Sequence, residues 1–119
     1  MKVKCIELRD AYGDRVARST WAKIGGIYHI LSIEIDRGQT KLRLVGEEPT
    51  PALFEVEMFE LVSSVIPPTW VISSPAPGCL SLEPASWARV GFWEEYFDGE
   101  PEAVATFEQE RERIVMSGR

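Results

Sequence analysis

The stretch GGIYHILSIEIDRGQTKLRLV, from Gly25 to Val45, decides the fold of this 119-residue chain. Side chains in its first half alternate between two faces of the chain, and β-branched residues are frequent there. Both features predict a strand over residues 27–35. In DRGQT the chain turns, because Gly38 can adopt positive φ. Alternation then resumes, with Leu42 and Leu44 expected toward the core and Lys41 and Arg43 toward solvent. The stretch therefore predicts a β-hairpin.

Shorter strands surround this hairpin. Alternation predicts one strand at 2–8 and another at 53–62, where the pattern breaks after Met58 and indicates a bend or a single helical turn. The polar segment 9–23, called the long loop below, carries no clear pattern. Prolines divide residues 63–84 and exclude a helix, so that 69–73 and 78–83 are expected to be the arms of a second hairpin.

The end of the chain is helical in pattern. Pro101 suits a first helical turn, the apolar residues recur at helical spacing, and Gly118 can end the helix. The stripe consists of Val104, Phe107, Arg111, Ile114 and Val115. A smaller helix is expected just before it.

The expected fold class is therefore α+β and mostly β. A small, strongly bent antiparallel sheet or SH3-like barrel is followed by a β-hairpin and C-terminal helices. We expect a single domain over 1–119, with the barrel part at 1–66 and the Pro-rich hairpin and helical cap at 67–119.

Charge is distributed unevenly along the chain. Its net charge is −6, yet residues 1–46 carry nine Lys/Arg and five Asp/Glu, whereas residues 47–118 carry three and fourteen. The acidic part disfavours nucleic acid and favours a cationic partner, although mutual attraction of the two parts is the simpler alternative. Basic residues between 2 and 23, with Tyr12 and Trp21 among them, could follow a single strand of nucleic acid, but the overall acidity argues against it.

Residues suited to catalysis are few. His29 is the single histidine, and it shares its predicted strand face with apolar residues, which favours a half-buried structural role. Cys5 and Cys79 are far apart in sequence, so they predict two small buried side chains rather than a zinc site or a bridge. No phosphate loop or calcium motif is present. We therefore expect no enzyme, no metal and no cofactor.

The chain contains no apolar run of the roughly 20 residues that a membrane helix needs. Its start, MKVKCIELRD, has no apolar region typical of a secretory signal. The sequence therefore predicts a cytoplasmic protein with no membrane partner.

The segment GFWEEYFDGEPEAV, Gly91 to Val104, combines aromatic and acidic residues. The aromatics Phe92, Trp93, Tyr96 and Phe97 fit a helix buried on more than one side, so most of them are expected in the core. The acids among them each add under about 0.5 kcal/mol to folding. They serve either for solubility or for binding, and the residues alone leave both open.

Three motifs carry a resemblance over residues 24–110. They are a strand with Gly26, Tyr28, Ile30 and Leu31, a proline followed by an LF…FE pattern at Pro51, Leu53, Phe54, Phe59 and Glu60, and the element GFWE…D at 91–98. In these the chain resembles small SH3-like bacterial immunity proteins of polymorphic toxin systems. The resemblance implies stoichiometric inhibition of a cognate toxin, and a basic toxin would complement the acidity.

We therefore predict a non-catalytic protein-binding inhibitor that uses an acidic surface. The residues expected to bind are Glu94, Glu95, Asp98, Glu100 and Glu102, a second acidic row of Glu55 and Glu57, and Tyr96 or Trp93 as an aromatic anchor. The alternative is an SH3-like adaptor that binds a peptide or small ligand in an aromatic groove. An exposed cluster of Tyr12, Trp21 and Tyr28 beside the long loop would favour that alternative.

Overall fold

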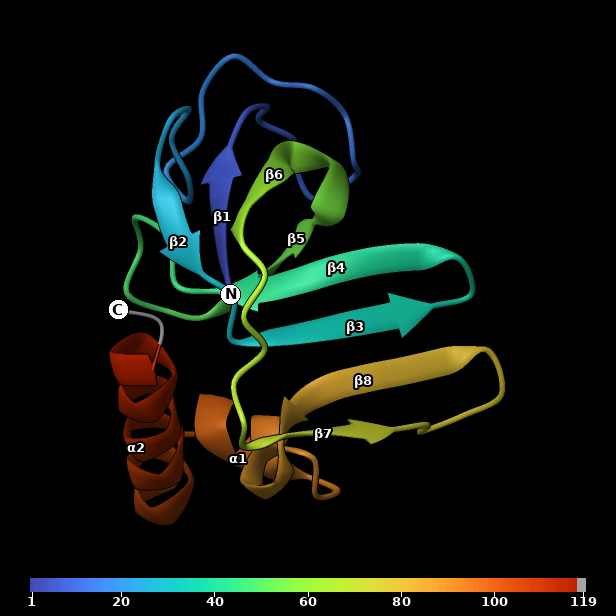
Figure 1. Ribbon diagram of the computed structural model, residues 1–119, viewed down its shortest axis with the longest axis vertical. Helices are drawn as coiled ribbons and strands as arrows, with labels where there is room; N and C mark the ends of the chain where they lie inside the picture. Colours follow the sequence, from blue (N-terminus) through green and yellow to red (C-terminus); the bar gives the residue numbers. More distant parts are fainter. Residues whose placement is uncertain (118–119) are drawn as a thin grey trace.

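The computed structural model describes residues 1–117 and shows an α+β protein built mainly from strands. Two antiparallel sheets pack together without closing into a barrel, and two α-helices follow at the C-terminal end (Figure 1). This confirms the predicted fold class and, of its two forms, favours the bent sheets over a closed SH3-like barrel.

The first sheet has the strand order β2-β1-β6. Its strands are β1 (Lys2–Cys5), β2 (Ile27–His29) and β6 (Phe59–Ser63). The long loop joins β1 to β2 and contains only an isolated bridge between Arg9 and Arg15.

The second sheet has the order β5-β4-β3-β8-β7. Its strands are β3 (Ser32–Asp36), β4 (Gln39–Leu44), β5 (Ala52–Glu55), β7 (Trp70–Ser73) and β8 (Cys79–Pro84). Both predicted hairpins are present, since β3 pairs with β4 and β7 pairs with β8. Because β8 also pairs with β3, the Pro-rich hairpin extends the same sheet.

The β3–β4 turn uses two residues at positive φ, Arg37 at 48° and Gly38 at 87°. Two such residues form the tight turn whose twist matches that of the flanking strands. The sequence predicted one strand over 53–62 with a bend or helical turn at its end, after Met58. The 3₁₀ helix η1 (Val56–Met58) instead interrupts this segment between β5 and β6, because Met58 and Phe59 are both buried where the chain passes from the second sheet to the first.

The helical end consists of the 3₁₀ helix η2 (Ala85–Trp87), α1 (Phe92–Phe97) and α2 (Pro101–Ser117). Helix α2 begins at Pro101 as predicted, and Phe107 and Ile114 of its stripe are buried. The expected stop at Gly118 lies outside the described residues.

Two buried clusters form the core. One lies between the sheets and includes Val3, Leu42, Leu44 and Phe54, and the other joins Leu31 and Trp87 to the two helices. Three rings are grouped around Phe107, whose centroid is 5.1 Å from Trp87, 5.9 Å from Trp93 and 4.7 Å from Tyr96. Burial of the second cluster fixes the helices against the sheet.

Three further sequence expectations were wrong in detail. The predicted strand 27–35 is interrupted, because Ile30 and Leu31 are both buried where the chain passes from one sheet to the other. Arg43 was expected in solvent and is only 6% exposed. Phe97 was grouped with the core aromatics and is 55% exposed.

Candidate functional site

The predicted acidic residues fall into two groups that the structure does not bring together. Glu55 and Glu57 lie in β5 and η1, whereas the other five lie in or beside α1 and at the start of α2 (Figure 1). The two groups occupy opposite ends of the molecule's long axis, so they cannot form one surface.

The Glu55 and Glu57 group is accompanied by cations. The carboxylate of Glu55 lies 4.0 Å from the Lys41 ammonium. The Arg9 guanidinium donates a hydrogen bond to Glu7, which raises the pKa of Arg9. The charges of Glu57 and Glu55 raise the pKa of Arg9 further. This end of the protein is therefore of mixed sign.

The acids around α1 are largely without cations. Glu94, Asp98, Glu100 and Glu102 are exposed, and no ion pair joins any of them to a cation within residues 1–117. Glu95 is the exception among the five predicted acids, because it pairs with Arg89. The cations of α2 are occupied as well, since Arg111 and Arg113 pair with acids on their own helix. An excess of carboxylates therefore remains on this surface.

The exposed aromatic side chain on this surface is Phe97. It follows Glu94 by one helical turn and adjoins Asp98, and its ring centroid lies 5.2 Å from Tyr96 and 6.0 Å from Trp93. Sequence reasoning placed it in the core. The sheet and α2 cover the side of α1 that carries Phe92, Trp93 and Tyr96, and Phe97 lies beyond this covered side. We call Phe97, Glu94, Asp98, Glu100 and Glu102 the acidic helical surface.

The two predicted anchors are used mainly inside the protein. Trp93 is half-buried, with its ring centroid 3.8 Å from the Arg43 guanidinium carbon and its indole nitrogen 3.5 Å from Glu83. Tyr96 is half-buried against Phe107, and burial raises the pKa of its hydroxyl. These contacts hold α1 on the sheet and leave Phe97 as the exposed ring.

The charged group beneath Trp93 is unusual for a core. The Arg43 guanidinium lies 3.3 Å from a carboxylate oxygen of Glu34, and burial lowers its pKa. Glu83 is buried beside it, and burial raises the pKa of that carboxyl. The indole face and the nearby acids offset part of the cost of burying charge there, and the Arg43 Nε atom is buried without a hydrogen-bond partner.

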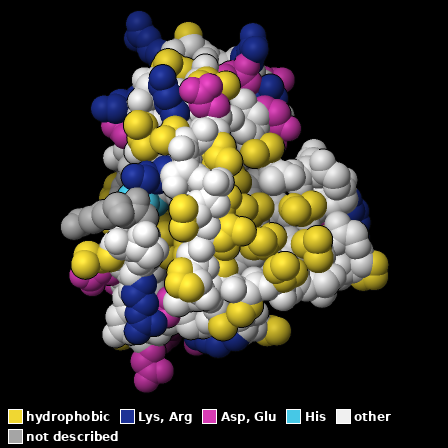
Figure 2. Space-filling model, in the orientation of Figure 1, with side chains coloured by type: hydrophobic (Ala, Val, Ile, Leu, Met, Phe, Trp, Pro, Cys, Tyr) yellow, Lys and Arg dark blue, Asp and Glu magenta, His cyan; other side chains and the backbone are white. Residues whose placement is uncertain are grey.

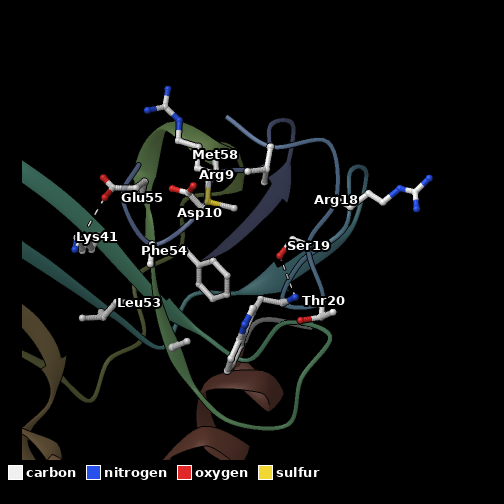
Figure 3. A pocket seen from close by; sticks show the side chains of 14 residues that line it. Arg9, Asp10, Arg18, Ser19, Thr20, Lys41, Leu53, Phe54, Glu55 and Met58 are labelled. Carbon is white, nitrogen blue, oxygen red and sulfur yellow. Dashed lines mark hydrogen bonds and ion pairs between the residues drawn. The ribbon is translucent and has the colours of Figure 1, made fainter. Parts of the chain in front are cut away.

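A cavity of about 540 Å³ lies at the other end, between the long loop and β5 (Figure 3). Val16, Trp21, Phe54 and Met58 supply apolar lining, and Asp10 lies at its edge. One oxygen of Asp10 already accepts the backbone N–H groups of two loop residues. Arg18 lines the rim but its guanidinium points away from the cavity (Figure 3).

The three aromatics expected beside the long loop do not form one exposed cluster. Tyr12 is 91% exposed and Trp21 is 42% exposed, but Tyr28 is buried. The Tyr28 hydroxyl donates to Glu47 at 2.9 Å and accepts the backbone N–H of Lys23, so it fixes the end of the loop. Burial raises the pKa of that hydroxyl.

The remaining reactive side chains are dispersed. Cys5 is buried in the first sheet, Cys79 is half-exposed in the second, and both are free thiols. Within the described part of the chain, no three His, Cys, Asp or Glu side chains are placed to hold a metal ion. None of the helices described here has the length and apolar character to span a membrane.

Comparison of the chain with protein-family models, curated proteins and solved structures finds no match.

Proposed function

We propose that this is a non-catalytic binding protein of the immunity type, which neutralises a basic protein, such as a toxin, by stoichiometric association through the acidic helical surface. The observation that carries the proposal is Phe97, 55% exposed and surrounded by carboxylates that have no cation of their own. Desolvated aromatic rings dominate the energy of many interfaces, and charged rims accelerate the encounter.

The helix packing favours this use of the surface. Because Trp93 and Tyr96 are held by Arg43 and Phe107, Phe97 projects from a helix whose position is already determined. A partner that binds it need not order the helix first, which lowers the entropic cost of association. The four carboxylates lose little by accepting external cations, since no internal ion pair is broken.

Charge reversal tests the proposal. A tagged protein would be used to recover partners from a lysate of the organism that encodes it, with washes at about 0.15 M and about 1 M salt, where the screening length falls from about 8 Å to about 3 Å. We expect one basic protein in equimolar amount, weakened at high salt. The variant E94K/E100K/E102K should recover none of it. Its melting temperature should fall by only a few degrees, because these exposed side chains lose favourable interactions with the helix dipoles but no packing.

The matched control is D14K/E48K/E60K, which changes the net charge equally at acids outside the acidic helical surface. It should recover the partner as the wild type does. Equal recovery by E94K/E100K/E102K would show that the acidic helical surface is not the binding site. Equal loss in both variants would show that net charge alone governs association.

A second candidate function rests on the cavity beside the long loop. Its apolar lining, with Trp21 at the edge, fits a peptide or small ligand bound in an aromatic groove. Trp21→Ala separates the two candidates in the same recovery experiment. Loss of the partner in W21A, with retention in E94K/E100K/E102K, would favour the groove.

A further inference from the structure

The second sheet carries an apolar row that is covered at one end only. Phe54 pairs with Leu42, Leu42 with Ile33, Ile33 with Leu82 and Leu82 with Ile72. Directly paired residues in antiparallel strands point to the same face, so this row crosses the whole sheet. Phe54 and Leu42 are buried against the first sheet, whereas Ile72 is 70% exposed.

Neighbouring residues enlarge the uncovered end. The next row on the same face pairs Ile35 with Leu80, which is 43% exposed. The connection before β7 adds Val65 and Ile66, at 65% and 57% exposed. Figure 2 shows hydrophobic side chains spread over the region where Figure 1 places β3, β8 and β7. We call this patch the apolar sheet face; it consists of Ile33, Ile35, Val65, Ile66, Ile72, Leu80 and Leu82.

This face carries no charge. The segment 61–82 contains no Asp, Glu, Lys or Arg, although 27% of the chain is charged. In Figure 2 the charged side chains gather above and below the patch rather than on it. Monomeric proteins rarely leave contiguous apolar patches larger than a few hundred Å² in solvent.

Strand β7 adds an open backbone edge to the face. It is the last strand of its sheet and pairs with β8 alone. Edge strands are normally protected by lysines, prolines or inward-pointing charges, and WVIS has none of these. A second copy packed face to face about a two-fold axis would bring the same residues of each copy together and cover the strand at this edge.

We propose that the apolar sheet face, with β7 at its margin, packs against the same face of a second copy of this chain. Two chains of net charge −6 repel each other, so their contact must exclude the acids, and this face excludes them. Val65, Ile66, Ile72 and Leu80 together expose roughly 400 Å² per copy, and the half-buried Ile33, Ile35 and Leu82 add to it, which approaches the lower limit of stable interfaces. The dimer is therefore reversible and depends on concentration.

The test is the mass of the full chain in solution, measured by light scattering between about 5 and about 500 µM at low and high salt. We expect the mass to rise from one chain toward two, and to rise at least as readily at about 1 M salt, because apolar association needs no attraction between charges. Ile72→Lys should raise the dissociation constant at least about 30-fold, as for a central interface residue.

Val90→Lys is the matched control. Val90 is fully exposed and lies in the loop before α1, so its replacement by lysine also exchanges a β-branched apolar side chain, with the same change of charge, outside the apolar sheet face. This variant should dimerise like the wild type. Both Ile72 and Val90 are exposed, so neither substitution should prevent folding.

Amide hydrogen exchange tests whether β7 takes part in the interface. The peptides that contain β7 should exchange more slowly at high protein concentration in the wild type and equally at both concentrations in I72K. A single-chain mass at every concentration would overturn the proposal, as would equal dimerisation of I72K and V90K. A dimer without added protection in β7 would also overturn it. None of these outcomes involves the acidic helical surface, so they leave the proposed function unaffected.

Discussion

Replacement of Arg43 by methionine should destabilise the protein by removing the cation beneath helix α1. Arg43 is 6% exposed, its guanidinium carbon is 3.8 Å from the Trp93 ring centroid, and it lies 3.3 Å from a Glu34 oxygen. Methionine retains much of the apolar stem, so packing is largely kept. The loss of stability therefore measures the contribution of the positive charge. Glu83 then remains buried without its neighbouring cation.

The expected loss is about 2–4 kcal/mol. The contact with the indole face contributes about 1–2 kcal/mol where it is desolvated, and a buried acceptor left without its charged partner costs about 1–3 kcal/mol. Domains of this size are stable by about 5–15 kcal/mol, so the variant should still fold. Its melting temperature should fall by about 10 °C.

Urea unfolding followed by tryptophan fluorescence would measure this loss. A decrease below about 1 kcal/mol would refute the reasoning that Arg43 stabilises the buried Glu83 carboxylate. The double variant R43M/E83Q should recover at least about 1 kcal/mol, because the amide removes the buried charge. If R43M/E83Q is no more stable than R43M, the instability of R43M does not come from the buried Glu83 carboxylate.

The direction in which stability changes with pH follows from the pKa of Glu83. Burial raises the pKa of Glu83, so the folded protein binds this proton more tightly than the unfolded chain does. The contribution of Glu83 to stability is therefore complete below the unfolded pKa and is lost as pH rises through the higher folded pKa. Without Arg43 that pKa rises further, so the deficit of R43M should grow from acidic to neutral pH and stay nearly constant in R43M/E83Q.

Three further outcomes are expected elsewhere in the protein. Phe107→Ala should cost about 3–5 kcal/mol in urea unfolding, because this fully buried ring is central to the aromatic cluster; a cost near 1 kcal/mol would show that the helices pack otherwise. Gly46→Ala should speed tryptic cleavage of the long loop, since the new Cβ would lie 2.0 Å from the Trp21 carbonyl oxygen, and an unchanged rate would contradict this close contact. Asp36→Asn should speed alkylation of Cys79 at neutral pH, because the hydrogen bond to the Asp36 carboxylate raises the pKa of that thiol; equal rates would exclude this cause.

Local patterns predicted the strands and turns where one physical cause dominates. Alternation with a glycine turn predicted the β3–β4 hairpin, because it depends on neighbours in sequence, whereas the irregular pattern near Met58 indicated a helical turn but not its place at 56–58. Pro101 likewise predicted the start of α2. These signals are local, so a single sequence carries them.

The residues whose exposure was predicted wrongly are those for which exposure depends on which element covers each face of a strand or helix. Alternation along β4 separates Leu42 and Leu44 from Arg43, but it does not tell whether the second face meets solvent. Here the first sheet covers one face and Trp93 of α1 the other, so both sets are buried. Phe97 is the converse case, an aromatic ring in an apolar helix that the neighbouring elements leave uncovered.

The buried charge and the exposed ring are parts of one arrangement. Arg43 attracts Trp93 to the sheet, and Trp93 and Tyr96 then occupy the inward side of α1. Phe97 has no remaining place inside and is directed outward among Glu94 and Asp98. A charged residue in the core, which is costly to bury, thus determines where the aromatic ring of the acidic helical surface is displayed. This coupling explains why the aromatic residues predicted as anchors are structural, while the one assigned to the core is available to a partner.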